Sequence, residues 1–141
     1  MLLLGWMTLI FCLSAQGGDE SSVTSNSFGA LLYTLLRSIF PFLQISLDAF
    51  VKEYVPLIRK IAHFSEFAVL GILIYLNLWE FSKKNIIVYS SLLSVLYAAL
   101  DEIHQLFVDG RCCSVKDALI DSAGALCGIL FCHFLKMKWR K

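Results

Sequence analysis

Residues 96–111 read LYAALDEIHQLFVDGR, and they follow the apolar run IIVYSSLLSV at residues 86–95. The combined stretch, 86–107, is long enough to cross a bilayer, because a helix rising 1.5 Å per residue needs about 20 residues for the hydrocarbon core. It nevertheless carries two adjacent carboxylates, Asp101 and Glu102, near its end. A charged side chain at mid-bilayer costs about 2.5–3.5 kcal/mol on insertion scales, so these groups need polar partners.

Two neighbouring segments, Ile61–Trp79 and Val115–Leu135, are similarly long and apolar. Leu2–Ala15 is shorter, and we interpret it as a first span; the alternative, a signal peptide, lacks a basic region ahead of its apolar core. The chain is 58% hydrophobic, above the roughly 45–50% of soluble domains. The sequence therefore predicts an all-α integral membrane protein, a four-helix bundle in a single domain over 1–141, with spans at about 2–15, 61–79, 86–107 and 115–135.

The first two predicted spans are joined by a long connection. Residues 16–27 are rich in Ser and Gly and predict a polar linker. Residues 28–58 have apolar side chains at helical spacing, and we expect Pro41 and Pro56 to interrupt the helices. Neither piece is long enough to span, so we interpret 28–58 as two amphipathic helices. They would either lie on the membrane surface or cover the bundle.

Lysine and arginine in short flanks predict the orientation, because cytoplasmic loops are enriched in them. Lys83 and Lys84 lie between the second and third spans, and the tail after the fourth span reads KMKWRK, with Lys136, Lys138, Arg140 and Lys141. Both segments belong on one side. We therefore expect a multi-pass protein of the cell membrane with cytoplasmic N- and C-termini and an extracytoplasmic connection at about 28–58.

With this topology, the polar residues of three spans and one turn meet at the outer side. On the fourth span, Asp117 and Asp121 share a stripe with Gly124 and Gly128, within about 60° at 100° per residue. The G-x-x-x-G spacing allows a second helix to approach closely. The polar groups either pair to fix helix register or line an outward-facing pocket, and we favour the pocket. They are Lys60, His63, Glu66, Asp101, Glu102, His104, Gln105, Arg111, Lys116, Asp117 and Asp121.

Several chemistries are compatible with this set. His63 and Glu66, like Asp101 and His104, have the i, i+3 spacing of a carboxylate and an imidazole. Such pairs hold a divalent metal in some bundles, but they also form simple salt bridges, and we expect no metal. A net charge of +1 without a basic tract interleaved with aromatics excludes nucleic-acid binding. The nearly uncharged inner halves of the spans argue against ion transport.

Three classes of function remain, and we favour the first. It is a non-enzymatic protein without cofactor that binds a membrane-lipid headgroup, a lipid-linked cell-wall precursor or a lipoglycopeptide. The second is a membrane enzyme acting on lipid-linked or phosphate-containing envelope substrates, with or without a metal. The third is a structural partner of another envelope protein. The sequence gives no indication of the oligomeric state.

Three stretches together resemble the VanZ-like family of small bacterial membrane proteins, which are associated with resistance to glycopeptide antibiotics, notably teicoplanin. They are FCLSAQGGDESS at 11–22, KIAHFSEFAVLG at 60–71 and DEIHQLFVDGRCCSVKDALIDSAGALCG at 101–128. The resemblance implies a four-span fold and a resistance phenotype, but no defined chemistry. Two positions depart from the family pattern: Asp109 stands where a proline is expected, and Phe67 where a tyrosine is common.

The resemblance also points to particular positions of this chain. The residues that match the family pattern, and that it implies for the polar site, are Lys60, His63, Asp101, Glu102, Gln105, Arg111, Ser114, Asp117 and Asp121. Gly124 and Gly128 match as helix-packing positions. Among these we expect Arg111 to hold an anionic group through paired N–H donors.

Overall fold

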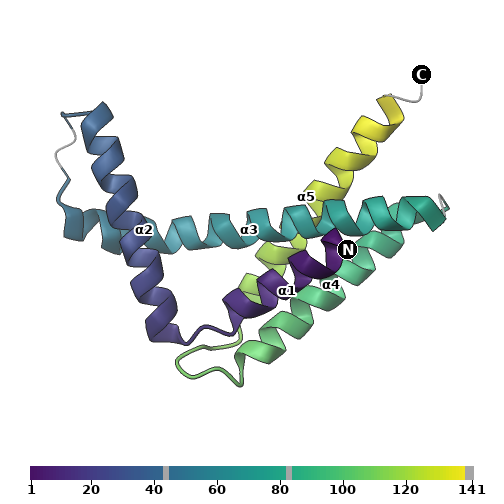
Figure 1. Cartoon of the computed structure of the whole chain (residues 1–141), viewed down its shortest axis with the longest axis horizontal. Coiled ribbons are helices and arrows are strands. Elements are labelled where there is room, and N and C mark those ends of the chain that lie inside the picture. Colours follow the sequence, from purple (N-terminus) through teal and green to yellow (C-terminus); the bar gives the residue numbers. More distant parts are fainter. Residues whose placement is uncertain (43–44, 82–83, 139–141) are drawn as a thin grey trace.

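The computed structural model describes residues 1–42, 45–81 and 84–138, and within these ranges the chain contains helices and no strand. The helices are α1 (Leu2–Ser14), α2 (Gly18–Ile39), α3 (Leu47–Phe81), α4 (Ile86–Gln105) and α5 (Val115–Lys138). The long helix α3 forms the axis of the molecule (Figure 1). One end of α3 is crossed by α2, and α1, α4 and α5 surround the other part. The all-α prediction is confirmed.

Three helices, α3, α4 and α5, are long and apolar enough to cross a membrane. By contrast, the 13 residues of α1 reach only about 20 Å, less than the roughly 30 Å of the hydrocarbon core. Helices α1 and α2 pass the same test only as a pair, which is bent by 104°. The protein is thus a membrane protein with three candidate spans, and a fourth span through α1 stays a prediction.

The predicted break at Pro56 is wrong, because α3 runs through this proline as one helix of 35 residues. The second span therefore belongs to a helix that begins at Leu47, not near residue 61. Proline lacks an N–H and leaves the carbonyl four residues earlier, at Lys52, without its helical partner. Both Lys52 and Pro56 line a cavity between α2 and α3. That carbonyl is therefore not sealed in an apolar core, and the helix can continue.

The predicted polar linker at 16–27 is also wrong, because α2 already begins at Gly18. The acidic residues Asp19 and Glu20 occupy its first turn, where the helix dipole favours negative charge. Most hydroxyl groups of its first ten residues donate to carbonyls one turn back in the helix, as Ser22 does to Gly18 and Ser25 to Ser21, each at 2.7 Å. The Ser-rich composition therefore led to a helical segment being interpreted as a linker.

Smaller differences occur at the other boundaries. Helix α4 ends at Gln105, short of the predicted 107, and α5 continues beyond the predicted 135 to Lys138. Lys83, Arg140 and Lys141, on which part of the orientation prediction rests, lie outside the described residues. The orientation stays a prediction.

The packing of α5 against α3 fixes the rest of the bundle. A Cβ atom added at Gly124 would meet the carbonyl oxygen of Phe64, and one at Gly128 would meet that of Ala68. On the opposite side, a Cβ at Gly71 would meet the carbonyl oxygen of Ala125. Only glycine allows such backbone contact. The two helices therefore touch without intervening side chains, as the G-x-x-x-G spacing suggested.

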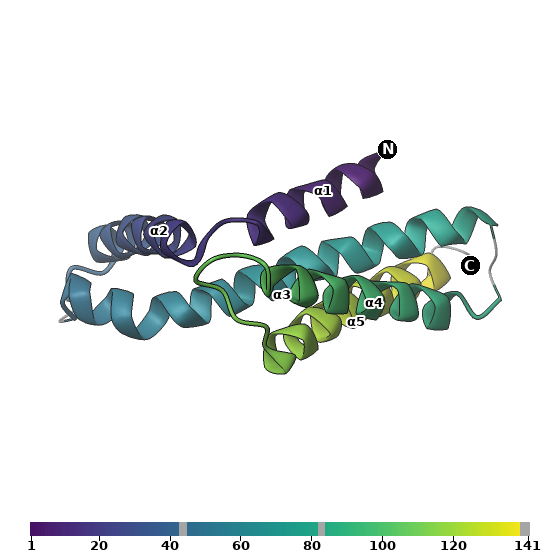
Figure 2. The same cartoon turned by 90° about the horizontal axis from the view of Figure 1, so that it is seen from below.

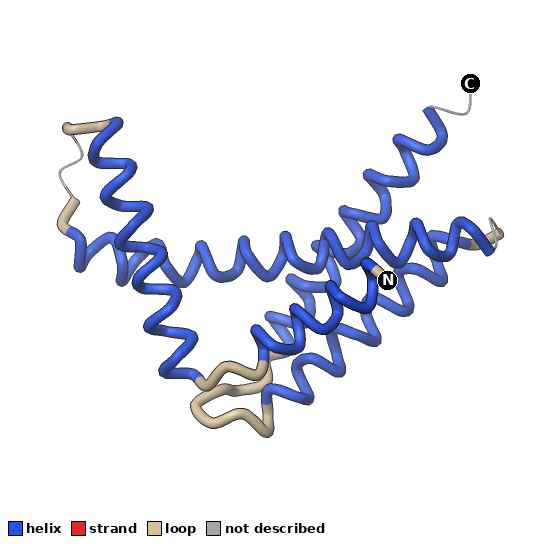
Figure 3. The backbone as a smooth tube through the Cα atoms, viewed as in Figure 1, coloured by secondary structure: helices blue, strands red, loops and turns tan. Residues whose placement is uncertain are grey.

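Helix α1 lies on the outside of α3 and α4 (Figure 2). The Trp6 indole N–H donates to the carbonyl of Glu66 (2.9 Å), and the Tyr97 hydroxyl donates to the carbonyl of Met7 (2.7 Å). Figure 3 shows the α1–α2 connection beside the α4–α5 connection. There the N–H of Gly18, the first residue of α2, donates to the carbonyl of Asp109 (2.9 Å), so both α1 and its connection to α2 are held against the bundle.

Candidate functional site

A cavity of about 240 Å³ opens where α3, α4 and α5 meet the α4–α5 turn. Most of the residues predicted for the polar site line it, from three different helices and the turn. They are Lys60, His63, Glu102, Gln105, Arg111, Asp117 and Asp121, joined by Pro56, Arg59 and Ile120. The structure thus brings seven of the nine predicted residues together around one volume.

The other two predicted residues, Asp101 and Ser114, lie behind the cavity wall. The buried Asp101 carboxylate accepts hydrogen bonds at Oδ2 from Ser14 Oγ (2.8 Å) and Gln105 Nε2 (3.1 Å). The Ser114 backbone N–H donates to Glu102 Oε2 (2.7 Å), and its hydroxyl accepts from the Asp117 N–H (3.3 Å) at the start of α5. Both residues therefore position the groups that line the cavity.

The sequence reasoning missed two contributors to this site, Ser14 and Arg59. Ser14, at the end of α1, holds Asp101 from a helix that was not expected to reach the polar residues. Arg59 was not among the residues predicted for the polar site, yet it lies one turn before His63 on α3 and lines the same cavity. The signal for Arg59 was its i, i+4 spacing from His63, which was hidden by the expected break at Pro56.

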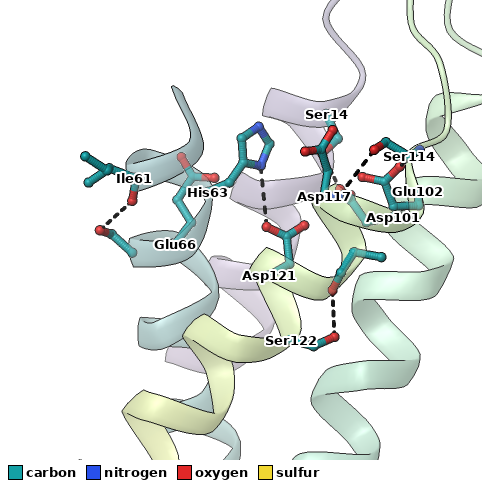
Figure 4. Close-up of polar contacts among 12 residues, drawn as sticks. Ser14, Ile61, His63, Glu66, Asp101, Glu102, Ser114, Asp117, Asp121 and Ser122 are labelled. Atoms are coloured by element: carbon teal, nitrogen blue, oxygen red, sulfur yellow. Dashed lines mark hydrogen bonds and ion pairs between the residues drawn. The ribbon is translucent and has the colours of Figure 1, made fainter. Parts of the chain in front are cut away.

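Opposite charges face each other in the cavity, and its Lys and Arg side chains form no ion pair with the described carboxylates. Three cationic side chains and three carboxylates line it: Arg59, Lys60 and Arg111, and Glu102, Asp117 and Asp121. In the part of the chain that the structure describes, the only ion pair is His63 Nδ1 with Asp121 Oδ1, at 3.9 Å. Figure 4 shows the His63 ring and the Asp121 carboxylate facing each other from α3 and α5. The Lys and Arg charges are thus available to a ligand.

Arg111 lies in the turn outside the predicted spans. Its Nε donates to the carbonyl of Gln16 (3.1 Å), which fixes the guanidinium at the cavity edge. Burial lowers the pKa of Arg111 from its ordinary value, but an arginine remains protonated in proteins. The side chain is therefore a held cation with further N–H donors.

Asp121 is the most deeply placed carboxylate of the cavity, with 1% of its surface exposed. Neither of its oxygens accepts a hydrogen bond from any described residue. Buried polar groups in native proteins are nearly always hydrogen-bonded, and an unpaired buried carboxylate is costly. Such an exception makes Asp121 a candidate for binding or chemistry.

A second cavity, of about 330 Å³, lies beside the first, between α1, α2 and α3. Much of its wall is apolar and includes Leu13, Phe28, Val55 and Ile58. Arg59, His63 and Arg111 line both cavities. The polar and apolar volumes are therefore neighbours that share one charged border.

The remaining predicted polar residues do not line the first cavity. Glu66 lines the second cavity, and the His104 ring stacks on Phe11 at a centroid distance of 4.3 Å. Lys116 lines neither volume. Among the described residues, no group of three or more His, Cys, Asp or Glu side chains is arranged to hold a metal ion.

Comparison with known proteins identifies the family. The family model described as VanZ/LLP1 matches residues 1–136, which include α1 to α4, all but the last two residues of α5 and all candidate site residues. Comparisons with curated proteins and with solved structures gave no match. The match covers almost the whole chain and confirms the resemblance seen in the sequence. The protein therefore belongs to the VanZ/LLP1 family.

Proposed function

We propose that the polar cavity binds the headgroup of a membrane lipid, a lipid-linked cell-wall precursor or a lipoglycopeptide. Through this binding the protein contributes to glycopeptide resistance, notably to teicoplanin, in the cell membrane that holds it. The cavity opens to the extracytoplasmic side, with both termini in the cytoplasm and α1 as a short first span. The observation that supports the proposal most is that three cations without an ion pair among the described residues, Arg59, Lys60 and Arg111, line one volume together with three carboxylates.

The size and lining of the cavity favour a headgroup over a whole molecule. At about 240 Å³ it is smaller than the 300–1,000 Å³ of sites for drug-sized ligands. Arginine and lysine bind phosphate and carboxylate groups through charge-assisted hydrogen bonds, and arginine can form two at once. The apolar helices that carry the cavity would keep the hydrophobic part of the ligand in the membrane.

The test is a resistance measurement in a susceptible bacterial host. Cells expressing the wild-type chain should need more teicoplanin for growth inhibition than cells without it. Arg111→Ala and Asp117→Asn should abolish this protection at unchanged protein levels in the membrane, because each removes a charge from the cavity. Glu80→Gln is the matched control, since Glu80 is exposed on α3 and does not line the cavity. If both cavity variants protect like the wild type, the proposed site is wrong.

One observation favours a second candidate, a membrane enzyme acting on phosphate-containing envelope lipids. His63 and Asp121 approach each other at 3.9 Å in the cavity wall, and a carboxylate beside an imidazole can orient a general base or nucleophile. Release of phosphate from a lipid phosphate by the purified protein, abolished in His63→Gln, would favour the enzyme. Binding that survives His63→Gln, without turnover by the wild type, would favour the binding protein.

A further inference from the structure

We propose that the ligand is a zwitterionic phospholipid with a primary ammonium group, an inference that rests on the proposed headgroup site. Its phosphate lies at the border shared by the two cavities, its ammonium reaches Asp121, and an acyl chain occupies the apolar cavity. The order of chemistry along such a lipid, acyl chain, phosphate and ammonium, matches the order of apolar cavity, cationic border and acidic floor in this protein.

The border between the cavities has the chemistry that a phosphodiester needs. Arg59 and Arg111 line both volumes, one from α3 and one from the α4–α5 turn. Neither forms an ion pair with a carboxylate among the described residues. A lipid phosphate is the group that joins the acyl part to the headgroup. A ligand that fills both cavities would therefore place its phosphate between these two guanidinium groups.

The polar cavity has the chemistry that an ammonium needs. Its carboxylates come from α4 and α5, and the deepest of them, Asp121, is buried with both oxygens free of hydrogen bonds within the described ranges. A primary ammonium carries three N–H donors and a positive charge, and it would satisfy this carboxylate. A purely anionic headgroup would instead bring more negative charge toward Asp117 and Asp121.

The apolar cavity is suited to the hydrocarbon part of the same molecule. Leu13, Phe28, Val55 and Ile58 contribute to its wall. It adjoins the polar cavity through three shared residues, so a single amphiphile can enter both. Moving an acyl chain from a bilayer into this cavity contributes little free energy, because the lipid tails are as apolar as the cavity wall. The headgroup contacts, not the chain, should therefore decide which lipid is retained.

The experiment uses the full chain, purified in detergent and offered three phospholipids with identical acyl chains. Phosphatidylethanolamine has a primary ammonium, phosphatidylcholine a quaternary one without N–H donors, and phosphatidylglycerol has no cation. Bound lipids are counted by native mass spectrometry. We expect phosphatidylethanolamine to be retained about tenfold over the other two, the equivalent of one charge-assisted hydrogen bond.

Variants assign the two ends of the headgroup. Asp121→Asn should remove the preference for phosphatidylethanolamine over phosphatidylglycerol while phosphate-dependent binding remains. Arg59→Gln and Arg111→Gln should lower the retention of all three lipids by about tenfold each. Glu80→Gln should match the wild type. Unchanged helical content by circular dichroism and an unchanged elution volume show that each variant is folded.

The outcomes separate this inference from the proposed function. Tightest binding of phosphatidylglycerol, abolished by Arg111→Gln, would overturn the ammonium assignment and leave the headgroup site intact. A phosphatidylethanolamine preference that persists in Asp121→Asn would also overturn it. Equal, weak retention of all lipids by the wild type and every variant would overturn both this inference and binding of lipid headgroups at the cavity.

Discussion

Helices α3 and α5 meet in two very different ways within a few turns. Around Gly124 and Gly128 the two backbones touch, so that not even a Cβ atom fits. One turn nearer the start of α5, Asp121 and His63 face each other at 3.9 Å beside an open cavity. All the α5 residues involved lie on one stripe. The size of the residues on that stripe therefore decides whether the helices touch or diverge.

The proposed function gives the two regions different roles, stability for the glycine region and binding for the cavity region. Backbone contact in the glycine region fixes the helix positions through packing, which membrane helices need because lipid gives little hydrophobic driving force between them. The cavity region instead buries a carboxyl group, that of Asp121, whose oxygens accept no hydrogen bond from the described residues. Binding sites commonly carry such a cost, and a rigid neighbouring contact keeps their geometry. The following predictions test this division.

The largest expected effect is in the glycine region. Gly128→Ala should lower the free energy of unfolding by about 3 kcal/mol, because the added Cβ would meet the carbonyl oxygen of Ala68, and a helix backbone cannot yield locally. Unfolding of the purified protein in mixed detergent micelles, titrated with a denaturing detergent, measures it. Gly5→Ala on α1 is the control, since nothing lies within 4 Å of its Cβ position.

Gly5→Ala should leave stability unchanged or raise it by up to about 1 kcal/mol, as expected for a glycine replaced inside a helix. Equal effects of the two substitutions would mean that the α3–α5 contact is not as close as described, and the contrast between the two regions would fail.

The next effect is at the rear of the cavity. Ser14→Ala should cost about 2 kcal/mol, because the buried Asp101 carboxylate loses one of its two hydrogen-bond donors and no water can easily replace it. The same unfolding titration measures it. Ser22→Ala is the control: that exposed hydroxyl donates only within its own helix. A cost no greater than that of Ser22→Ala would show that α1 does not hold the cavity wall.

Gly128 and Ser14 show how much of this architecture can be predicted from the sequence. Gly128 could be placed, since the stripe with the acids and the G-x-x-x-G spacing are both local helical patterns. The role of Ser14 could not, because it depends on how α1 packs against α4, and nothing in the residues near Ser14 encodes that distant contact. Asp101 was correctly expected to need a polar partner, but Ser14 was not expected to be that partner.

The helix boundaries show the same limit. The apolar runs predicted α4 and α5 to within a few residues, since a span needs a minimum length whatever surrounds it. Pro56 and the Ser-rich residues 16–27 were interpreted from local preference alone. In both segments the structure differs from the local preference. At Pro56 the helix continues because there is open space beside Lys52 and Pro56, and in residues 16–27 hydroxyl groups bond within their own helix. Arg59 was missed for the same reason.

A third prediction reverses the sign of the effect. Asp121→Asn should raise the free energy of unfolding by about 1 kcal/mol, because it removes a buried carboxyl group that is costly to ionise and whose oxygens accept no hydrogen bond from the described residues. Thermal unfolding in the absence of added lipid measures it. Asp101→Asn is the informative comparison. The Asp101 carboxylate accepts two hydrogen bonds, from Ser14 and Gln105, so this substitution should lower the free energy of unfolding. A loss of stability for Asp121→Asn would mean that the fold, not a ligand, requires this carboxylate.

The smallest effect is expected at the far end of the same helices, away from the charged residues of the cavity. There the Tyr75 hydroxyl and His133 Nδ1 are 2.9 Å apart. Tyr75→Phe keeps the buried ring and removes one neutral hydrogen bond, so it should cost only about 0.5–1 kcal/mol. His133 is partly exposed, and its nitrogen can turn to another partner. Lipid retention should be unchanged, because this pair is remote from both cavities around Arg111. A loss of headgroup selectivity in Tyr75→Phe would show that the two ends of the bundle are coupled. Packing in the glycine region and binding in the cavity region would then not be separate.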